Sequence, residues 1–517
     1  MAQFQRIWTG KIKAGLALAG VIGMAMPAVA QTATRTKPVA AKPVSVKPVT
    51  GETVPGRTLD EKIRNILGTI PKGARAGFVV TTLEGREIIA IRPDERFVPA
   101  SNTKLFTTAA AYTFLPELKN GTAPRGNAAL IGSGARPDIS LIGYGDARMS
   151  SAPDCQVDCL ATLADAIAKQ HRTVGDIIGD SRYLVDDRFS MGMAWNNIPT
   201  RSGAGLAALS LDGNEVALMV KPGAAQGAAA LVEAPGYYRV INRVVTRAEM
   251  PTKIDYYRSP GSRDILLTGT IQPASSGQQA TTGQPAPTAQ RLRFGIEDPA
   301  DYAAFRLAEL LRARGVTVRG TSRALYRLPG TSAPVETPTT LSLTPPSLAD
   351  DVRIINKDSQ NVYAELLLRR VGASQGDGSV EGGLKVVEAM LAQAGVPRTA
   401  WDFSDGSGMS TYNRVSPRAT AQLLRWAANQ PWGMAWRQSL PIGGSDGTLA
   451  RRFADTPLQG KIFAKTGTVN AATALSGYLV TAKGRTLIFS SYVADIPADG
   501  SVTALVDKAL LLIAAEN

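Results

Sequence analysis

The chain has 517 residues, of which 44% are hydrophobic and 19% charged, so it is globular rather than disordered and long enough for two or three domains. Its net charge of +14 does not point to nucleic acid, because three of these charges lie in residues 1–30 and four in residues 31–57. The single histidine, His171, excludes an H-E-x-x-H zinc site and disfavours a Ser-His-Asp triad. We expect no metal and no other cofactor.

Residues 1–30 have the pattern of a secretory signal peptide. Three basic residues precede an apolar run over residues 14–26, and small residues that suit a cleavage site end at Ala30. The run is shorter than the roughly 20 residues that a membrane span needs, so no integral membrane anchor is expected. We therefore predict export to the periplasm.

Residues 31–57 form a basic, proline-rich stretch. Lys-Pro pairs recur there at five-residue intervals, which favours an extended linker. This linker is either a plain spacer or a contact for anionic polymers of the cell envelope.

The only two cysteines, Cys155 and Cys159, lie close together. In an exported chain such a pair favours a disulfide within a loop. A metal site is disfavoured because further ligands are hard to find.

The first elements of the predicted fold are a helix and a β-hairpin. Residues 59–67 have helical character, and two apolar, β-branched runs over 76–82 and 86–91 are joined by a Glu-Gly turn. A loop that turns into a helix follows from Pro99.

From residue 121 to about 340 the sequence predicts an inserted, mainly β module. Glycines, turns and short strand-like runs such as Ile139–Ile142 dominate it, with helices over 160–169 and 299–314. Residues 272–290 form a low-complexity loop rich in Ser, Gln, Thr and Pro.

The C-terminal part predicts helices and three strands. Because the hairpin lies at one end of the chain and these elements at the other, residues 58–120 and 341–517 are predicted to form one discontinuous α/β domain. The helices cover residues 348–356, 362–370, 380–394 and 501–515, with another beginning at Ser416-Pro417, and the strands cover 461–464, 475–481 and 486–493.

The spacing of Ser101 and Lys104 suggests a nucleophile and its base. On a helix, side chains three residues apart lie on one face. A serine hydroxyl needs a base within hydrogen-bond reach, and a lysine serves where burial and neighbouring charge lower its pKa. Alone the pattern is weak, since about one match is expected by chance in a chain of this length.

Two downstream motifs strengthen this interpretation. Ser359-Gln360-Asn361 lies between two predicted helices, and Lys465-Thr466-Gly467-Thr468 lies at a predicted strand. Together with S-x-x-K, and in this order, they form the signature of penicillin-binding proteins and class A β-lactamases.

Further motifs narrow the resemblance. They are Pro99–Lys104, Tyr144–Asp146, Ala207–Ser210, Lys357–Asn361 with Ala364-Glu365, Asp405–Gly408, Asp446–Leu449 and Ala464–Thr468. With these motifs the chain resembles, from about residue 58 to its end, the D-alanyl-D-alanine carboxypeptidase/endopeptidase family of class C low-molecular-mass penicillin-binding proteins. The long gap between Ser101 and Ser359 is typical of that family. Gln360 and Met409 depart from it, because the family often has Asp and Leu there.

The resemblance implies an α/β (α+β) domain of the serine β-lactamase/transpeptidase type, split by the inserted module. It implies that Ser101 attacks the substrate and that Lys104, its pKa lowered with help from Lys465, takes the proton. Ser359 then relays that proton to the leaving amine, and Asn361 holds Lys104 and the substrate amide. Backbone N–H groups of Ser101 and Thr468 would form the oxyanion hole, and the terminal carboxylate would be bound by Lys465, Thr466, Gly467 and Thr468.

The resulting prediction is a periplasmic serine D,D-carboxypeptidase and endopeptidase, with peptidoglycan stem peptides and β-lactams as its partners. It would hydrolyse D-Ala-D-Ala termini and cross-link peptide bonds through an acyl-enzyme on Ser101. Two alternatives are a β-lactamase, which the large insert disfavours, and an inactive envelope-binding scaffold, which has no need of an intact motif set. We expect the inserted module to wall one side of the substrate groove without supplying its chemistry.

Overall fold

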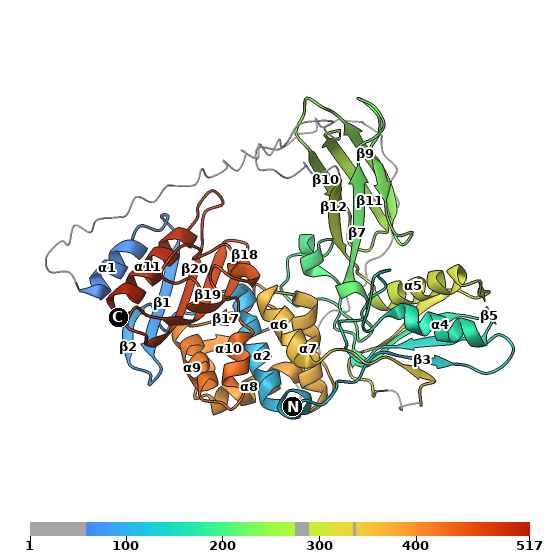
Figure 1. Cartoon of the computed structure of the whole chain (residues 1–517). Helices are drawn as coiled ribbons and strands as arrows, with labels where there is room; N and C mark the ends of the chain where they lie inside the picture. The colour runs from blue at the N-terminus through green and yellow to red at the C-terminus, as the bar shows by residue number, and fades with distance from the viewer. Residues whose placement is uncertain (1–57, 274–288, 334–337) are drawn as a thin grey trace, which may run out of the picture. The chain divides into compact units, whose positions relative to one another are not determined.

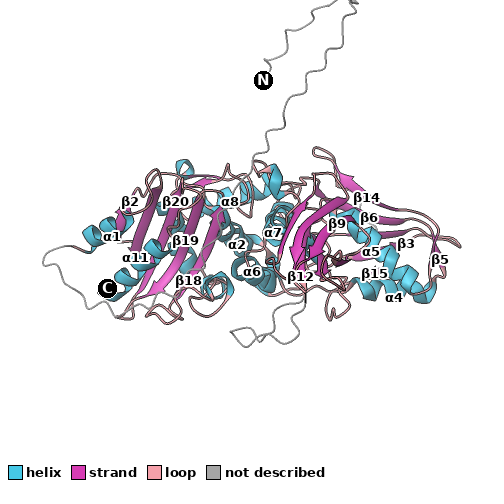
Figure 2. Ribbon diagram, turned by 90° about the horizontal axis from the view of Figure 1, so that it is seen from above, coloured by secondary structure: helices cyan, strands magenta, loops and turns pink. Residues whose placement is uncertain are grey.

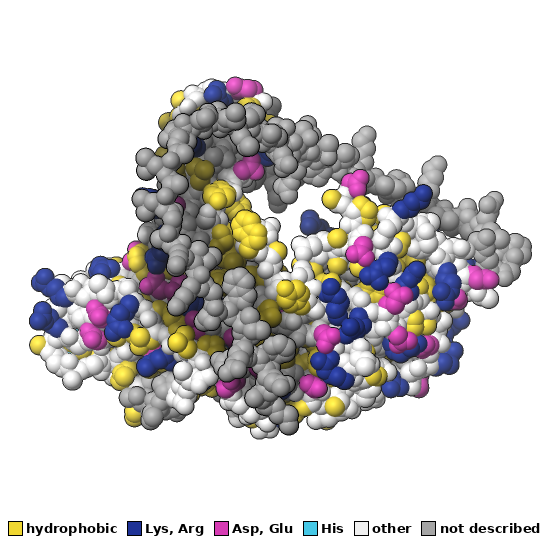
Figure 3. Space-filling model, turned by 180° about the vertical axis from the view of Figure 1, so that it is seen from behind, with side chains coloured by type: hydrophobic (Ala, Val, Ile, Leu, Met, Phe, Trp, Pro, Cys, Tyr) yellow, Lys and Arg dark blue, Asp and Glu magenta, His cyan; other side chains and the backbone are white. Residues whose placement is uncertain are grey.

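The computed structural model describes residues 58–273, 289–333 and 338–517. The predicted signal peptide, the proline-rich linker and nearly all of the low-complexity loop 272–290 lie outside these residues. Within the described ranges, no helix combines the length and the apolar character needed to cross a membrane. Figure 3 shows basic and acidic side chains interspersed over one face of the molecule.

A five-stranded antiparallel sheet joins the two ends of the chain. Strand β1 pairs with β20 from Arg75–Ala494 to Thr82–Leu487, so the first strand lies beside the last (Figure 1). In spatial order the strands are β18 (Ile462–Val469), β19 (Ala472–Val480), β20 (Thr486–Ala494), β1 (Arg75–Thr82) and β2 (Glu87–Ile91).

Strand β18 is longer than the predicted strand over 461–464. Each residue from Ile462 to Val469 pairs with β19, so the whole Lys-Thr-Gly-Thr motif lies within the strand. The prediction stopped at Ala464 because the polar residues that follow lack a strand-like hydrophobic pattern, whereas the backbone ladder with β19 does not depend on that pattern.

Helices cover both faces of the sheet, and alternate strand residues point to opposite faces. In β1, Phe78 and Val80 pack with the first and last helices, whereas Val79 belongs to the core on the other face. Figure 2 shows the strands between α11 on one side and α2 and α8 on the other. The first helical layer, on the face of Phe78 and Val80, holds α1 (Leu59–Leu67) and α11 (Thr503–Glu516). The second helical layer, on the face of Val79, holds α2 (Thr103–Phe114), α3 (Pro116–Asn120), α6 (Leu348–Lys357), α7 (Asn361–Ala373), α8 (Val380–Gln393), α9 (Pro417–Ala428), α10 (Gly433–Gln438) and the short strand pair β16 (Trp401–Asp402) and β17 (Arg414–Val415).

Helix α2 is the central helix of the second layer. Ten of its residues in a row, Thr103–Tyr112, are buried, which is typical of a helix enclosed by protein on all sides. The helix therefore holds its first turn, with Lys104, in a fixed position inside the molecule.

Residues 121–340 are built largely from strands and have their own buried core. Strand β15 pairs with β3, so the module's sheet extends two residues past the predicted boundary at 340. The sheets have the orders β14-β6-β4-β3-β15, β10-β11-β9, β12-β7-β8 and β13-β5. The elements are β3 (Ala128–Ile131), β4 (Ile139–Ile142), α4 (Leu160–Gln170), β5 (Thr173–Val174), β6 (Ile177–Val185), β7 (Glu215–Lys221), β8 (Leu231–Glu233), β9 (Arg239–Thr246), β10 (Lys253–Tyr257), β11 (Asp264–Ile271), β12 (Gln290–Gly295), α5 (Pro299–Ala313), β13 (Thr317–Val318), β14 (Ser322–Arg327) and β15 (Leu341–Ser342).

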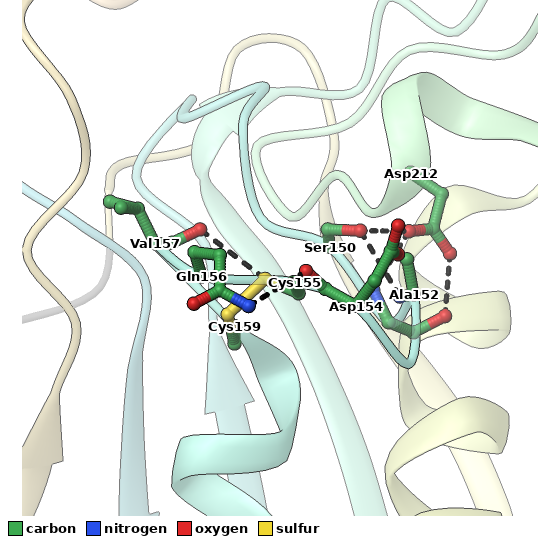
Figure 4. The surroundings of a disulfide bond; sticks show 9 residues. Ser150, Ala152, Asp154, Cys155, Gln156, Val157, Cys159 and Asp212 are labelled. Atoms are coloured by element: carbon green, nitrogen blue, oxygen red, sulfur yellow. Dashed lines mark hydrogen bonds between the residues drawn. A yellow bond between two sulfur atoms is a disulfide. The ribbon is translucent and has the colours of Figure 1, made fainter.

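Cys155 and Cys159 form a disulfide in the loop that leads into α4 (Figure 4). Beside it, Asp212 accepts hydrogen bonds from the side-chain hydroxyls of Ser150 and Ser151 at 2.9 and 2.6 Å. The predicted disulfide is present, and it closes a short loop at the start of a helix.

Candidate active site

Ser101 lies in a 3-10 turn, Ala100–Asn102, that leads directly into α2. The turn brings Ser101 Oγ to 2.8 Å from Lys104 Nζ, one helical turn along. The predicted nucleophile and base are therefore in hydrogen-bond contact.

Lys104 is fully buried, and its amine has three oxygen neighbours. Besides Ser101 Oγ these are Asn361 Oδ1 at 2.7 Å and the backbone carbonyl of Ser407 at 2.6 Å. The last two oxygens only accept hydrogen bonds, so a neutral amine donates its two N–H groups to them and turns its lone pair towards Ser101. This geometry suits proton abstraction from the serine hydroxyl.

Burial lowers the pKa of Lys104 to about 7, while the negative charges of Asp405 and Glu365 oppose that shift. Burial is the largest cause of this lowering, and the mutual repulsion of the Lys104 and Lys465 ammonium groups, which we expected, acts in the same direction. A substantial fraction of Lys104 is thus neutral near physiological pH, which a general base requires.

The loop over 405–410 is held by two buried carboxylates. Glu365 accepts hydrogen bonds from the backbone N–H groups of Gly406 and Ser407 at 3.0 and 2.8 Å. Asp405 accepts from Gly408 N at 2.9 Å and from Ser410 N at 2.6 Å. Burial, with the charge of Glu365 in addition, raises the pKa of Asp405 to about 6. These bonds aim the Ser407 carbonyl at Lys104.

Lys465 and Ser359 form the second half of the site. Lys465 Nζ, also fully buried, donates to Ser359 Oγ at 2.9 Å and to the Thr466 carbonyl at 3.0 Å. Burial first, and then the charge of Lys104, hold the pKa of Lys465 well below its usual value. Asn102 Nδ2 donates to the Lys465 carbonyl at 2.9 Å, which ties this strand to the turn that carries the nucleophile.

Gly467 lies where β18 packs against the turn that carries the nucleophile. A Cβ atom there would be 2.7 Å from the Pro99 carbonyl oxygen and 3.0 Å from the Ser101 nitrogen, so only glycine allows this approach. Thr466 Oγ1 is bonded to Thr448 Oγ1 at 2.7 Å, and Thr468 is exposed.

The structure brings all eight predicted site residues to one place. Lys104 is hydrogen-bonded to both Ser101 and Asn361, and Lys465 is hydrogen-bonded to Ser359. Gly467 lies against the backbone at Ser101, with Thr466 and Thr468 on either side of it in β18. The sequence did not reveal two backbone carbonyls of the site, that of Ser407, which accepts from Lys104 Nζ, and that of Ser202, which accepts from Asn361 Nδ2. A backbone oxygen leaves no side-chain signature. The Asp-Gly-Ser-Gly motif that ends at Gly408 was the available signal for Ser407. Among the residues described, no group of three or more His, Cys, Asp or Glu side chains could hold a metal ion.

Comparison with known proteins identifies the family of the chain. The model of the D-Ala-D-Ala carboxypeptidase 3 (S13) family matches residues 59–516. The chain belongs to this family. The predicted resemblance and the predicted serine-type D-Ala-D-Ala carboxypeptidase class are thereby confirmed.

Two relatives of known name illustrate the similarity. The D-alanyl-D-alanine carboxypeptidase of Actinomadura sp. (strain R39) is 33% identical over 439 residues, which cover 81% of this chain and 77% of the relative. The D-alanyl-D-alanine carboxypeptidase DacB of Haemophilus influenzae is 23% identical over 83% of this chain and 88% of its own.

The fold of the chain is also found among solved structures. The crystal structure of penicillin-binding protein 4 (dacB) from Haemophilus influenzae superposes with a TM-score of 0.70 at 20% identity, covering 87% of this chain and 98% of that one. The predicted fold class is confirmed by this likeness. The boundaries of the inserted module remain a prediction.

Proposed function

We propose that the chain is a serine D,D-carboxypeptidase and endopeptidase of peptidoglycan that works through an acyl-enzyme on Ser101. The observation that carries this proposal is the contact of 2.8 Å between Ser101 Oγ and the buried amine of Lys104, whose pKa is lowered to about 7. A nucleophile paired with a poised base is what acyl transfer requires.

Acylation begins with proton transfer from Ser101 Oγ to the lone pair of Lys104. The oxygen attacks the carbonyl carbon of the penultimate D-alanine, and the backbone N–H groups of Ser101 and Thr468 stabilise the resulting oxyanion, each by about 3 kcal/mol. Collapse of the tetrahedral intermediate breaks the C–N bond. The leaving amine takes up a proton from the hydroxyl of Ser359, and the Lys104 ammonium replaces that proton on Ser359.

We assign the orientation of the substrate to β18, the edge strand of the sheet. Lys465, with Thr466 and Thr468, offers positive charge and hydroxyls to the terminal carboxylate, and Gly467 keeps the strand close enough for the oxyanion hole. Water later hydrolyses the acyl-enzyme and restores Ser101. The same chemistry cleaves a terminal D-alanine or a cross-link peptide bond, depending on the leaving amine.

We assign this activity to the periplasm, after removal of residues 1–30. The signal-peptide pattern supports export, and the disulfide between Cys155 and Cys159 is typical of an oxidising compartment. Peptidoglycan stem peptides and β-lactams are the proposed ligands.

Mass spectrometry of the intact protein after exposure to penicillin tests the proposal. We expect an adduct on Ser101 that persists for minutes or longer, because a β-lactam resembles the D-Ala-D-Ala carbonyl. An unchanged mass would defeat the proposal and favour an inactive scaffold. Rapid turnover to free penicilloate would identify a β-lactamase instead.

A further inference from the structure

A polar cavity of about 530 Å³ lies next to the proposed catalytic motif and has no assigned role. Gln360, the residue between Ser359 and Asn361, forms part of its wall, together with Tyr363 from the first turn of α7. A group bound there would therefore sit one residue away from the proton-transfer machinery. The loop drawn in Figure 4, with Ser150 and Asp212, forms another wall.

Four arginines face this cavity, which we call the arginine pocket: Arg148, Arg291, Arg293 and Arg306. They come from three separate parts of the inserted region. Arg291 and Arg293 are two residues apart on β12, so they lie on the same face of the sheet, opposite Met219 and Ala217 of β7. Arg306 belongs to α5, and Arg148 to the loop after β4.

Three of the four guanidinium groups are already paired with carboxylates. Arg148 lies 3.6 Å from Asp351, Arg293 lies 2.6 Å from Glu215, and Arg306 lies 2.5 Å from Glu309. Arg291 is exposed and forms no ion pair within the described ranges. It is therefore the cation of the pocket that is available to a ligand.

The balance of charge selects the kind of ligand. Asp212 and Glu215 also line the pocket, which leaves only a small positive excess. A polymer of phosphates would bring repeated negative charge against these two carboxylates. A single carboxylate, which a guanidinium binds through paired hydrogen bonds, matches the pocket better.

We propose that the arginine pocket binds one free carboxylate of the peptide substrate, on a residue outside the scissile D-Ala-D-Ala unit, through Arg291. This assignment rests on the proposed function, because it places the rest of the peptide against Gln360 while the terminal carboxylate lies at Lys465. The pocket thereby contributes to the choice among acidic peptides without touching the reacting atoms.

Two synthetic pentapeptides test the assignment on the full chain. One is N-acetyl-L-alanyl-γ-D-glutamyl-L-lysyl-D-alanyl-D-alanine, and the other carries a carboxamide in place of the glutamyl α-carboxylate. The readout is the ratio of their kcat/KM values, which is independent of how much of a preparation is folded. We expect the native protein to show a kcat/KM about fivefold higher on the peptide with the free carboxylate, which is the size of effect that an exposed ion pair has. This ratio should fall at high salt, because salt screens exposed charges.

Arg291→Gln should bring this ratio to about one, and Arg291→Lys should keep an intermediate preference. The matched control is Arg243→Gln, which removes an exposed, unpaired arginine of β9 that does not line the pocket. The control should retain the native ratio.

Two results would overturn the assignment alone. One is a native ratio of about one in a protein that hydrolyses both peptides. The other is an unchanged ratio in Arg291→Gln, and weakened binding of poly(glycerol phosphate) by the same variant would then mark the pocket as a phosphate site. Absence of hydrolysis of both peptides, with no penicillin adduct on Ser101, would instead refute the proposed function and this assignment with it.

Discussion

The side-chain amide of Asn361 donates a hydrogen bond to the backbone carbonyl of Ser202, with 2.9 Å between nitrogen and oxygen. This bond fixes which end of the amide faces the base, because the nitrogen is engaged and the oxygen must point at Lys104. The inserted region therefore takes part in positioning the proposed general base. This contact orients a site residue and supplies no reacting group, so it adds a positioning role to the wall that we expect the module to form.

Asn361→Asp should move the pH dependence of acylation. A carboxylate at 2.7 Å from the amine would favour protonated Lys104 and raise its pKa from about 7 by about 1–3 units. The penicillin acylation rate, which we expect to rise with pH as Lys104 loses its proton, should then rise at correspondingly higher pH. Stopped-flow measurement across pH 5–10 tests this.

Asn361→Ala is the matched control for that experiment. It removes both hydrogen bonds without adding charge, so acylation should slow without an upward shift of the profile. If Asn361→Asp had the same midpoint as the native protein, neutral Lys104 would not be the base.

The free energy of unfolding should depend on pH because Lys104 is buried. Its pKa is about 7 when folded and 10.5 in an ordinary environment, so between these values the unfolded chain binds more protons and stability rises with pH. Lys104→Met removes this titration. Its stability relative to the native protein should be most favourable below pH 7 and fall by about 1.4 kcal/mol per pH unit up to pH 10.5.

Urea unfolding at pH 7 and pH 10 measures that difference. The exposed Lys119→Met in α3 is the control, and it should differ from the native protein by the same amount at both values. A constant difference for Lys104→Met would mean that Lys104 is protonated in the folded protein throughout this range.

The parts of the fold set by local spacing could be predicted from the sequence. Ser101 and Lys104 meet because three residues separate them at the start of a helix, and Ser416 caps α9 through its bond to Ala419 N, as a Ser-Pro start suggests. The β-hairpin of β1 and β2 likewise follows from two alternating runs and a tight turn.

What could not be predicted depends on contacts between distant backbones. The strand assignment of Thr466 and Thr468 comes from pairing with β19, and Ser202 reaches Asn361 over 159 residues of sequence through a carbonyl that any residue carries. Glu365 could be noticed as part of a motif, but its bond to the Ser407 N–H required the fold.

Gly467→Ala should separate the strand from the nucleophile. The new Cβ would lie 2.7 Å from the Pro99 oxygen, so β18 must shift, and a displacement of about 1 Å in an active site costs about 100-fold in rate. Penicillin acylation should slow by that order. Gly376→Ala, where the Cβ would meet its nearest atom at 3.5 Å, is the control and should acylate normally.

Lys465→Gln should impair turnover according to the charge of the substrate. Lys465 is the buried amine that faces the proposed carboxylate site, and a bound carboxylate favours its protonated form. Without this amine the substrate carboxylate is left unpaired, which costs about 2 kcal/mol or more, or about 30-fold in rate. We therefore expect about that loss of kcat/KM on a D-Ala-D-Ala peptide, and a clearly smaller loss on a thioester that lacks the terminal carboxylate. The exposed Lys461→Gln, four residues earlier, should affect neither substrate. Equal losses on both substrates would show that Lys465 acts through its bond to Ser359 Oγ, by keeping the proton-transfer groups in place, rather than by holding the substrate.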